Sequence, residues 1–270
     1  MRKRRAVLHG LYLSAGMTAG SHCEFPMKTI LAALLISVAA GHACLAATRL
    51  VEPKLRLENQ EKGAPPRVAL TFDACSGKTD ERILSTLIDN RIPATIFVTA
   101  RWVKRNAAAM AVFKAHPDLF EIENHGAMHV PAVDRPVSIY GIAAAGSPQA
   151  VETEVAGGAA AMVGQGLQPH WFRGATAKYT LSSIGQIRQM GFRIAGYSVN
   201  GDGGSLLGAA AAEKRFSSAR DGDVIIAHIN QPTHAAGSGV VKGILDLKAK
   251  GYAFVRLNDA TEDGSDETTN

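Results

Sequence analysis

The sequence lacks an apolar run long enough to cross a membrane, which needs about 20 apolar residues. Its longest stretch follows Met27 and one lysine, and holds about a dozen mostly apolar residues before the small residues of "CLAA". A basic start, a short apolar run and a small-residue end are typical of a secretory signal. We therefore predict cleavage near Ala46 or Ala47, a periplasmic or secreted protein, and no stable membrane insertion afterwards. Residues 1–47 are interpreted as an extension upstream of Met27 followed by this signal.

Cysteine is scarce, with three residues in the chain. Cys23 and Cys44 lie in the part predicted to be removed, so only Cys75 stays in the exported protein. A single thiol excludes an internal disulfide, and packing must then stabilise the fold. A lipid attached at Cys44 is the less favoured alternative, because the preceding "GHA" lacks the usual leucine.

The exported part also lacks a strong charge imbalance. The chain has 29 basic and 24 acidic residues, of which five basic residues and one acidic residue lie in residues 1–47. The remainder holds 24 basic and 23 acidic residues, a net charge of +1. Because no basic stripe with interleaved aromatic residues remains, we discount a nucleic-acid partner.

Short apolar runs alternate with stretches of helical spacing from Arg67 onward. These runs are apolar at consecutive positions and do not alternate between apolar and polar residues, as expected of parallel strands that are buried on both faces. About seven strands are predicted, at 67–72, 93–100, 119–123, 170–174, 192–199, 223–228 and 252–257. Helices are predicted between them, the first with Asp80 as its N-cap. With 46% hydrophobic residues overall, the pattern indicates one α/β domain, either a barrel or a doubly wound sheet.

Polar segments flank this domain. Residues 48–66 are polar and contain prolines, which predicts an exposed lead-in. Residues 258–270 are acidic and lack aromatic residues, which predicts a disordered tail. The folded domain is therefore placed at residues 67–257.

Five polar residues follow different predicted strands. They are Asp73, His125, Arg173, Asp202 and His228. The carboxyl ends of parallel strands carry the site in α/β domains, because the loops there bring side chains from several strands together. Each residue alone has an ordinary structural explanation, such as a helix cap or a packed histidine. Their common location predicts one site.

His125 and His129 are four positions apart in "ENHGAMH". On a helical turn this spacing puts both imidazoles on one face, where they can bind a zinc ion. Zinc peptidases with this spacing need a glutamate directly after the first histidine, and that residue is Gly126. The pair therefore predicts a metal site and excludes this class of peptidase.

Five segments occur in the order of the five motifs of a known family. They are "TFDACSG", "ENHGAMH", "FRGATAKY", "YSVNGD" and "IIAHIN". In these segments the chain, over roughly residues 67–257, resembles NodB-type polysaccharide deacetylases, which form carbohydrate esterase family 4. The resemblance implies a single domain folded as a distorted (β/α) barrel with about seven parallel strands, and a divalent metal ion that is usually zinc. It also implies a hydrolase of linear amide bonds that removes N-acetyl groups from a glycan containing N-acetylglucosamine, such as peptidoglycan or chitin.

The resemblance implies a role for each residue of the predicted site: His125 and His129 as metal ligands, Asp73 as catalytic base, Arg173 as the arginine that orients this base, His228 as catalytic acid, and Asp202 as the aspartate that supports the acid. These residue types suit amide hydrolysis. A carboxylate can take a proton from water, and a histidine can give one to the departing amine.

The chain departs from the family pattern in three motifs, and the departure in the fourth is an altered motif around Asp202 with Asn200 close by. The family's first motif has two consecutive aspartates, of which the second is a metal ligand, and Ala74 stands at that position. The metal ion is then held by the two histidines with water or Asp73, or Cys75 supplies a thiolate, or no metal binds firmly. We favour Cys75 as an inert buried residue. The third motif lacks its usual proline, and Tyr179 with nearby backbone N–H groups is a candidate for stabilising an oxyanion.

Two alternatives to a metal-dependent deacetylase are kept. Ala74 favours a catalytically degenerate family member that binds glycan without hydrolysing it, whereas Asp73, Arg173 and His228 argue against that interpretation. A metal-independent hydrolase of a small cyclic amide also occurs in the superfamily. Such enzymes are usually intracellular, so the signal segment counts against this second alternative.

Overall fold

A single main sheet organises the part of the chain that the computed structural model describes, residues 49–58 and 60–265. Its ten strands are β1 (Lys54–Leu57), β2 (Arg67–Ala74), β3 (Ala94–Val98), β4 (Phe120–Asn124), β7 (Trp171–Phe172), β8 (Arg193–Ile194), β9 (Val199–Asn200), β10 (Asp223–His228), β11 (Ala253–Val255) and β12 (Glu262–Ser265). They follow the order β12-β1-β10-β2-β3-β4-β7-β8, while β11 pairs with β2 and β9 with β10. All of these pairs are parallel except the two that β1 makes, with β10 and β12. The predicted α/β domain of mainly parallel strands is confirmed, and the sheet curls as half of a barrel.

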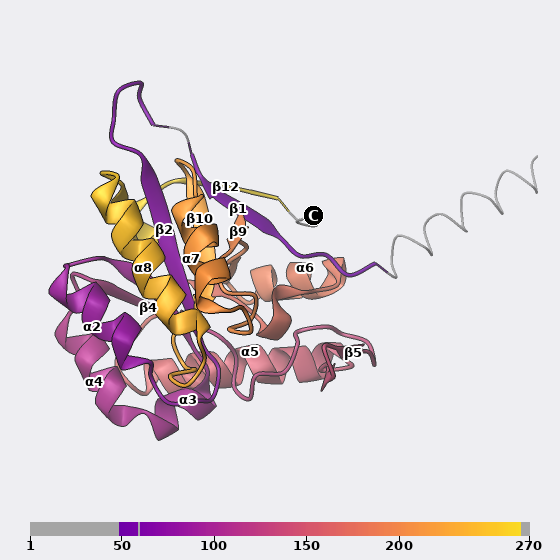
Figure 1. The fold of residues 1–270 in the computed structure, drawn as a ribbon. Helices are drawn as coiled ribbons and strands as arrows, with labels where there is room; N and C mark the ends of the chain where they lie inside the picture. The colour runs from indigo at the N-terminus through magenta and orange to yellow at the C-terminus, as the bar shows by residue number, and fades with distance from the viewer. Residues whose placement is uncertain (1–48, 59, 266–270) are drawn as a thin grey trace, which may run out of the picture. The chain divides into compact units, whose positions relative to one another are not determined.

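Helices cover the outer face of the sheet. They are α2 (Glu81–Asp89), α3 (Ala100–Arg105), α4 (Ala107–Ala115), α5 (Pro148–Val163), α6 (Leu181–Gln189), α7 (Ala209–Ser217) and α8 (Ala236–Ala249). Helices α7 and α8 pack against each other over β2 and β10 (Figure 1). Asp80 accepts a hydrogen bond from the backbone N of Arg82 at 3.1 Å, so its prediction as the N-cap of α2 is confirmed. None of the helices in the described residues has the length and apolar character that crossing a membrane requires.

Alternation of side chains along the strands determines which residues face the interior of the curled sheet. In β2, Leu70 and Phe72 belong to the core beneath the helices, whereas Ala69 belongs to a second core inside the curve. Successive residues of a strand point to opposite faces. Asp73 therefore shares the inner face with Ala69, and the same alternation along β10 places His228 on that face.

Two segments that were predicted to lie outside the domain belong to the sheet. The exposed lead-in is wrong for β1, where Leu55 and Leu57 are each 3% exposed. The disordered tail is wrong for β12, which pairs with β1 along four residues. Leu55 and Leu57 alternate with charged residues, and this pattern forms a strand because β10 and β12 supply its partners. The predicted signal segment and the last five residues of the tail lie outside the described residues.

The strand predicted at 192–199 is divided into β8 and β9 around Gly196. A Cβ atom on Gly196 would lie 2.2 Å from the carbonyl oxygen of Pro53. The same carbonyl accepts a hydrogen bond from the backbone N of Tyr197 at 3.3 Å. The segment before β1 therefore packs against Gly196. Its hydrogen bond from Tyr197 to Pro53 takes the place of strand pairing between β8 and β9.

Smaller elements complete the domain. A separate two-stranded sheet is formed by β5 (Ser138–Ile139) and β6 (Ile142–Ala143). Two short 3-10 turns are η1 (Ala175–Ala177) and η2 (Leu257–Asp259). The loop of β5 and β6 and the turn η1 both contribute to the cleft described below.

Candidate active site

The residues that were predicted from strand ends come together at one edge of the sheet. Parallel pairing places His228 directly opposite Asp73 on the neighbouring strand. His125, Arg173 and Asp202 follow β4, β7 and β9. The predicted location is therefore observed, whereas the chemical roles of these residues stay a proposal.

Arg173 is fully buried and holds Asp73 in one orientation. Its Nη1 donates to Asp73 Oδ1 at 3.1 Å and to Thr71 Oγ1 at 2.9 Å. Its Nε and Nη2 donate to the carbonyl oxygens of Ala195 and Gly196 at 3.1 and 3.0 Å. Burial raises the pKa of Asp73, but the surrounding histidines and the guanidinium outweigh burial and lower this pKa below its ordinary value. The site thus contains a buried carboxylate that is ionised near neutral pH.

One hydrogen bond sets the orientation of the His125 ring, which is 1% exposed. Its Nδ1 lies 2.6 Å from the carbonyl oxygen of Arg173, and because a carbonyl only accepts, Nδ1 carries a proton. The other nitrogen, Nε2, lies 3.8 Å from Asp73 Oδ2 and 3.6 Å from Cys75 Sγ. Burial lowers the pKa of His125, but Asp73 and Cys75 outweigh burial and raise it. The electrostatic environment of Nε2 therefore favours a positive charge.

His125 and His129 lie on a loop, so the helical turn from which their proximity was predicted is wrong. Gly126 and His129 have φ values of +87° and +65°, which no right-handed helix contains. The two imidazoles nevertheless lie side by side, with ring centroids 5.0 Å apart. Their proximity comes from a reversal of the backbone rather than from helical periodicity.

Glu154 of α5 holds this loop, although it was not among the residues predicted for the site. Its buried carboxylate accepts hydrogen bonds from the backbone N–H groups of Met128 and Val130, at 3.0 Å each. The backbone N of Ala127 donates to the Glu154 carbonyl oxygen at 2.9 Å. A Cβ atom on Gly126 would lie 2.4 Å from the Glu154 carboxylate, so glycine is required there. The only sign in the sequence was an acidic residue three and four positions before two glycines, within a helix rich in small residues.

Asn230 holds the turn after Asp73 and was also missed. With its amide oxygen facing the turn, it accepts hydrogen bonds from the backbone N of Ser76 at 3.1 Å and of Gly77 at 3.2 Å. Its amide nitrogen then donates to the Asp73 carbonyl oxygen at 3.1 Å. The residue was visible in the motif "IIAHIN", but a hydrogen bond to a turn more than 150 positions earlier has no local signal.

Cys75 lies beside both imidazoles of the loop. Its Sγ and one ring nitrogen from each of His125 and His129 all lie within 4.8 Å of one another. Burial raises the pKa of the thiol, but the nearby imidazoles outweigh burial and lower this pKa well below its ordinary value. Among the described residues, these three side chains form a group that could hold a metal ion, whereas an inert role was expected for the cysteine.

His228 is supported by Asp202 through two kinds of contact. Asp202 Oδ2 accepts from the backbone N of His228 at 2.7 Å, and His228 Nδ1 lies 3.1 Å from both carboxylate oxygens. Burial lowers the pKa of His228, but Asp202 outweighs burial and raises it well above its ordinary value. With Nδ1 committed to Asp202, the second nitrogen Nε2 is the one available for proton transfer.

A cleft of about 460 Å³ opens beside these groups. Asp73, His129 and His228 line it together with Tyr140 and Leu206, whose side chains are 75% and 80% exposed. Tyr140 lies between β5 and β6. The volume falls within the range of small-molecule sites, and the exposed ring and aliphatic side chain offer apolar contact to a ligand.

Tyr179 does not line this cleft, so its candidate role in stabilising an oxyanion is wrong. The side chain is fully buried, and its hydroxyl accepts a hydrogen bond from the backbone N of Gly174 at 2.7 Å. Thr176 and Ala177 line the cleft instead, with φ values of +69° and +52°. Tyr179 therefore supports the start of η1 through its hydrogen bond with Gly174, on the side of the turn away from the cleft.

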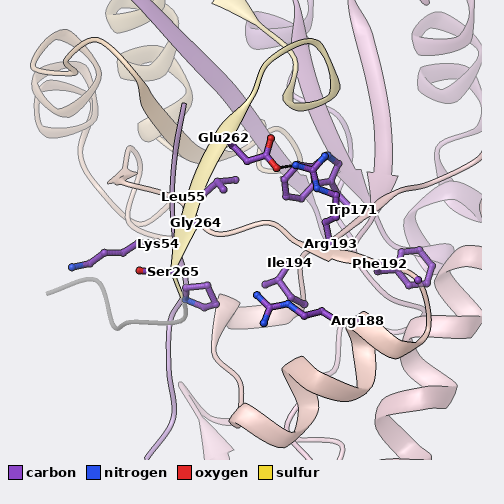
Figure 2. Close-up of a pocket in the computed structure, with 12 residues that line it drawn as sticks. Lys54, Leu55, Trp171, Arg188, Phe192, Arg193, Ile194, Glu262, Gly264 and Ser265 are labelled. Carbon is purple, nitrogen blue, oxygen red and sulfur yellow. Dashed lines mark ion pairs between the residues drawn. The ribbon is translucent and has the colours of Figure 1, made fainter. Parts of the chain in front are cut away.

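A second cavity, of about 490 Å³, lies at the amino ends of β7 and β8. Figure 2 shows residues that line it, among them Lys54 and Leu55 of β1, Glu262 of β12 and Arg193 of β8. The Arg193 guanidinium lies 3.9 Å from the centre of the Trp171 ring and pairs with Glu262. None of the residues predicted for catalysis or metal binding lines this cavity.

Comparisons with known proteins give a family match by sequence and similar folds among solved structures. A sequence model described as polysaccharide deacetylase matches residues 60–195. A search of curated protein sequences gives no significant match. The match begins before the predicted boundary at residue 67, and strands β1 and β12 lie in the sheet outside both predicted boundaries, 67 and 257.

Solved structures with a similar fold include enzymes and a pseudoenzyme. A pseudoenzyme of carbohydrate esterase family 4 from Bacillus anthracis is 19% identical, with a TM-score of 0.57, over 73% of this chain and 65% of that one. A peptidoglycan deacetylase from Bacillus subtilis is 18% identical, with a TM-score of 0.55, over 72% of this chain and 89% of that one. A family 4 acetyl xylan esterase from Clostridium thermocellum, in complex with a cobalt ion, is 23% identical, with a TM-score of 0.57, over 71% of this chain and 88% of that one. At these identities the likeness concerns the fold, and it confirms the expected distorted barrel.

Proposed function

Because the chain belongs to the polysaccharide deacetylase family, we propose that it is a metal-dependent hydrolase that removes N-acetyl groups from a glycan containing N-acetylglucosamine. The observation that carries the proposal is the convergence of Asp73, His125, His129 and His228 beside one cleft. A carboxylate, two metal-binding nitrogens and a second acid–base group are what hydrolysis of an acetamide needs.

The residues present fit a divalent ion. His125 has Nδ1 committed to the Arg173 carbonyl, so in the neutral ring Nε2 keeps its lone pair for a metal, an arrangement common among metal-binding histidines. The second ring, that of His129, lies beside it. When bound, the ion would polarise the acetamide carbonyl and make water more acidic. His125 and His129 are accordingly proposed as its ligands, with zinc as the preferred ion.

Asp73 would act as the base that takes a proton from the attacking water. Its carboxylate is oriented by Arg173 through Oδ1, which leaves Oδ2 free to face His125 at 3.8 Å. The lowered pKa keeps this group ionised and able to accept a proton near neutral pH. Arg173 is fully buried, so we assign it an orienting role rather than contact with substrate.

His228 would give a proton to the departing amine. Asp202 holds its Nδ1 and its backbone, so the ring presents Nε2 on the inner face of the sheet, next to Asp73. The two groups come from paired positions on adjacent strands, which fits a reaction with water on one side of the amide and a proton donor on the other. Positioned acids and bases of this kind contribute roughly 10²–10⁴-fold each.

The glycan would lie across the open cleft. Tyr140 and Leu206 at its rim can contact the apolar face of a sugar ring, while Asp73 and His228 face the acetamide. We also propose that the mature protein acts in the periplasm or is secreted, because residues 27–47 have the character of a secretory signal. Amino-terminal sequencing of the protein recovered outside the cytoplasm tests this, and a start at Met1 or Met27 would contradict it.

A degenerate, glycan-binding family member is the second candidate, and Ala74 is the observation that favours it. One solved structure with a similar fold is described as a pseudoenzyme of carbohydrate esterase family 4. The intact Asp73–Arg173 and His228–Asp202 pairs favour catalysis, because binding alone does not require them.

Acetate release from N-acetylglucosamine oligomers distinguishes the two candidates. The wild type should release acetate, and Asp73→Asn should abolish release while leaving oligomer binding intact. Asp118→Asn is the matched control, because Asp118 is a surface residue paired with Arg91. Oligomer binding without any acetate release by the wild type would favour the degenerate candidate.

A further inference from the structure

The chain departs from its family pattern at the residue after the proposed base. Ala74 stands where the resemblance expects a metal-binding aspartate, and its side chain packs fully buried in the core beneath the helices. An alanine offers no donor atom in any orientation. The next residue, Cys75, therefore decides whether the proposed metal site has a third protein ligand.

Cys75 is buried, yet it belongs to none of the three hydrophobic clusters found in the described residues. A cysteine that only packs behaves as a small apolar residue and is expected among apolar side chains. Its sulfur instead lies with the ring nitrogens of His125 and His129, all three atoms within 4.8 Å of one another. The surroundings of this thiol are those of a ligand.

The spacing between sulfur and nitrogen also matches a zinc site. Zinc lies about 2.3 Å from a cysteine sulfur and about 2.0–2.1 Å from a histidine nitrogen, so tetrahedral geometry places these two ligand atoms about 3.6 Å apart. The observed distance between Cys75 Sγ and His125 Nε2 is 3.6 Å. The separation of these two atoms is thus the one that a shared zinc ion requires.

Hydrogen bonds from distant parts of the chain fix the backbone of Cys75. Thr99 Oγ1 donates to its carbonyl oxygen at 2.6 Å. The Asn230 amide oxygen, facing the turn, accepts from its backbone N at 3.3 Å. Metal ligands that are held in this way are already organised before an ion binds.

We propose that the thiolate of Cys75 is the third protein ligand, with His125 and His129, of the divalent ion on which the proposed function rests. Two imidazoles and one thiolate favour zinc or cobalt over magnesium or manganese, because sulfur is a soft ligand. Three protein ligands leave a fourth position open, as in catalytic zinc sites. The cysteine thus takes over, one position later, the task that the family gives to an aspartate.

Cobalt binding to the full chain tests this inference without measuring activity. Cys23 and Cys44 are first replaced by serine, so that Cys75 is the only thiol. Cobalt that is bound by a thiolate absorbs in the near ultraviolet through sulfur-to-metal charge transfer, whereas imidazole and carboxylate ligands give no such band. We expect the band to grow with cobalt and to saturate at about one equivalent. Because this protein retains Cys75, the measurement does not depend on a variant of the site folding correctly.

Two substitutions at Cys75 serve as matched comparisons. Cys75→Asp supplies a carboxylate and should bind cobalt without the band. Cys75→Ala should bind cobalt at least ~100-fold more weakly, since even changes beyond the ligands cost about 10–100-fold in affinity.

Each unfavourable outcome has a separate meaning. Stoichiometric cobalt binding without the band overturns Cys75 as a ligand but leaves a metal-dependent hydrolase standing. Absence of cobalt and zinc binding overturns the inference and the metal dependence together, and acetate release by that metal-free protein would then still support hydrolysis.

Discussion

Removal of the Arg173 guanidinium should expose how strongly the buried pair with Asp73 is coupled. In Arg173→Met the Asp73 carboxylate stays buried and loses its charged partner, a change that costs roughly 3–5 kcal/mol in other proteins. The carbonyl oxygens of Ala195 and Gly196 also lose their donors, at about 1–3 kcal/mol each when buried. We therefore expect the free energy of unfolding to fall by at least about 5 kcal/mol.

The single substitution does not separate the charge pair from the carbonyl contacts, so a double-mutant cycle with Asp73→Asn is needed. Asp73→Asn alone leaves a buried, unpaired guanidinium and should also cost about 3–5 kcal/mol. The double variant contains neither charge. It should therefore be about 3 kcal/mol more stable than the sum of the single losses predicts.

Urea unfolding in the presence of a chelator measures this cycle without a contribution from metal binding. The exposed pair of Arg91 and Asp118 provides the control, because its side chains are 74% and 53% exposed and such pairs are worth about 0–1 kcal/mol. Coupling between Arg173 and Asp73 no larger than that of the control pair would refute the claim that Arg173 maintains a buried, ionised base.

Of three further predictions, two concern residues that support the site, and one concerns Glu123 of β4, two residues before His125. Asp202→Asn should reduce acetate release by at least ~10²-fold, because His228 loses the carboxylate that favours its protonated form. The metal content should stay unchanged, and loss of metal in this variant would contradict the role assigned to Asp202. Glu154→Gln should weaken zinc binding by about 10–100-fold, because the Glu154 carboxylate holds the loop that carries His125 and His129. Glu152→Gln, an exposed position on the same helix, should leave zinc binding unchanged. Competition with a metal-binding dye measures both affinities. Burial raises the pKa of Glu123 to about 8, above its ordinary value of 4.5. Its protonated form therefore contributes stability that is complete below about pH 4.5 and is lost as pH rises through about 8. Glu123→Gln should flatten this decline in the free energy of unfolding, and an unchanged pH dependence would count against it.

The part of the site that lies on strands was accessible from the sequence. In "RVALTFDA" the apolar run identified a buried strand, and its end located Asp73 at the edge where parallel strands place functional groups. The same reasoning located His228 at the end of β10. These predictions succeeded because strand position and facing follow from local pattern and the two-residue period.

Contacts between distant loops were not accessible in the same way. The position of His129 depends on positive φ values and on Glu154 of another element, and helical spacing was the wrong reason for its proximity to His125. Strand β1 depends on partners such as Asp223, which lies opposite Arg56 and far along the sequence. An inert Cys75 was favoured from the sequence because a lone cysteine has the same local pattern whether it packs or binds an ion.

Acetate production by the purified protein is the measurement that bears most directly on the central claim. Proton NMR can follow free acetate during incubation with an N-acetylglucosamine oligomer, using one sample reconstituted with zinc and one stripped of metal. Acetate should accumulate in the reconstituted sample only, and return of zinc to the stripped sample should restore it. Equal acetate production by both samples would contradict a metal ion at His125 and His129, and no acetate in either would contradict hydrolysis itself.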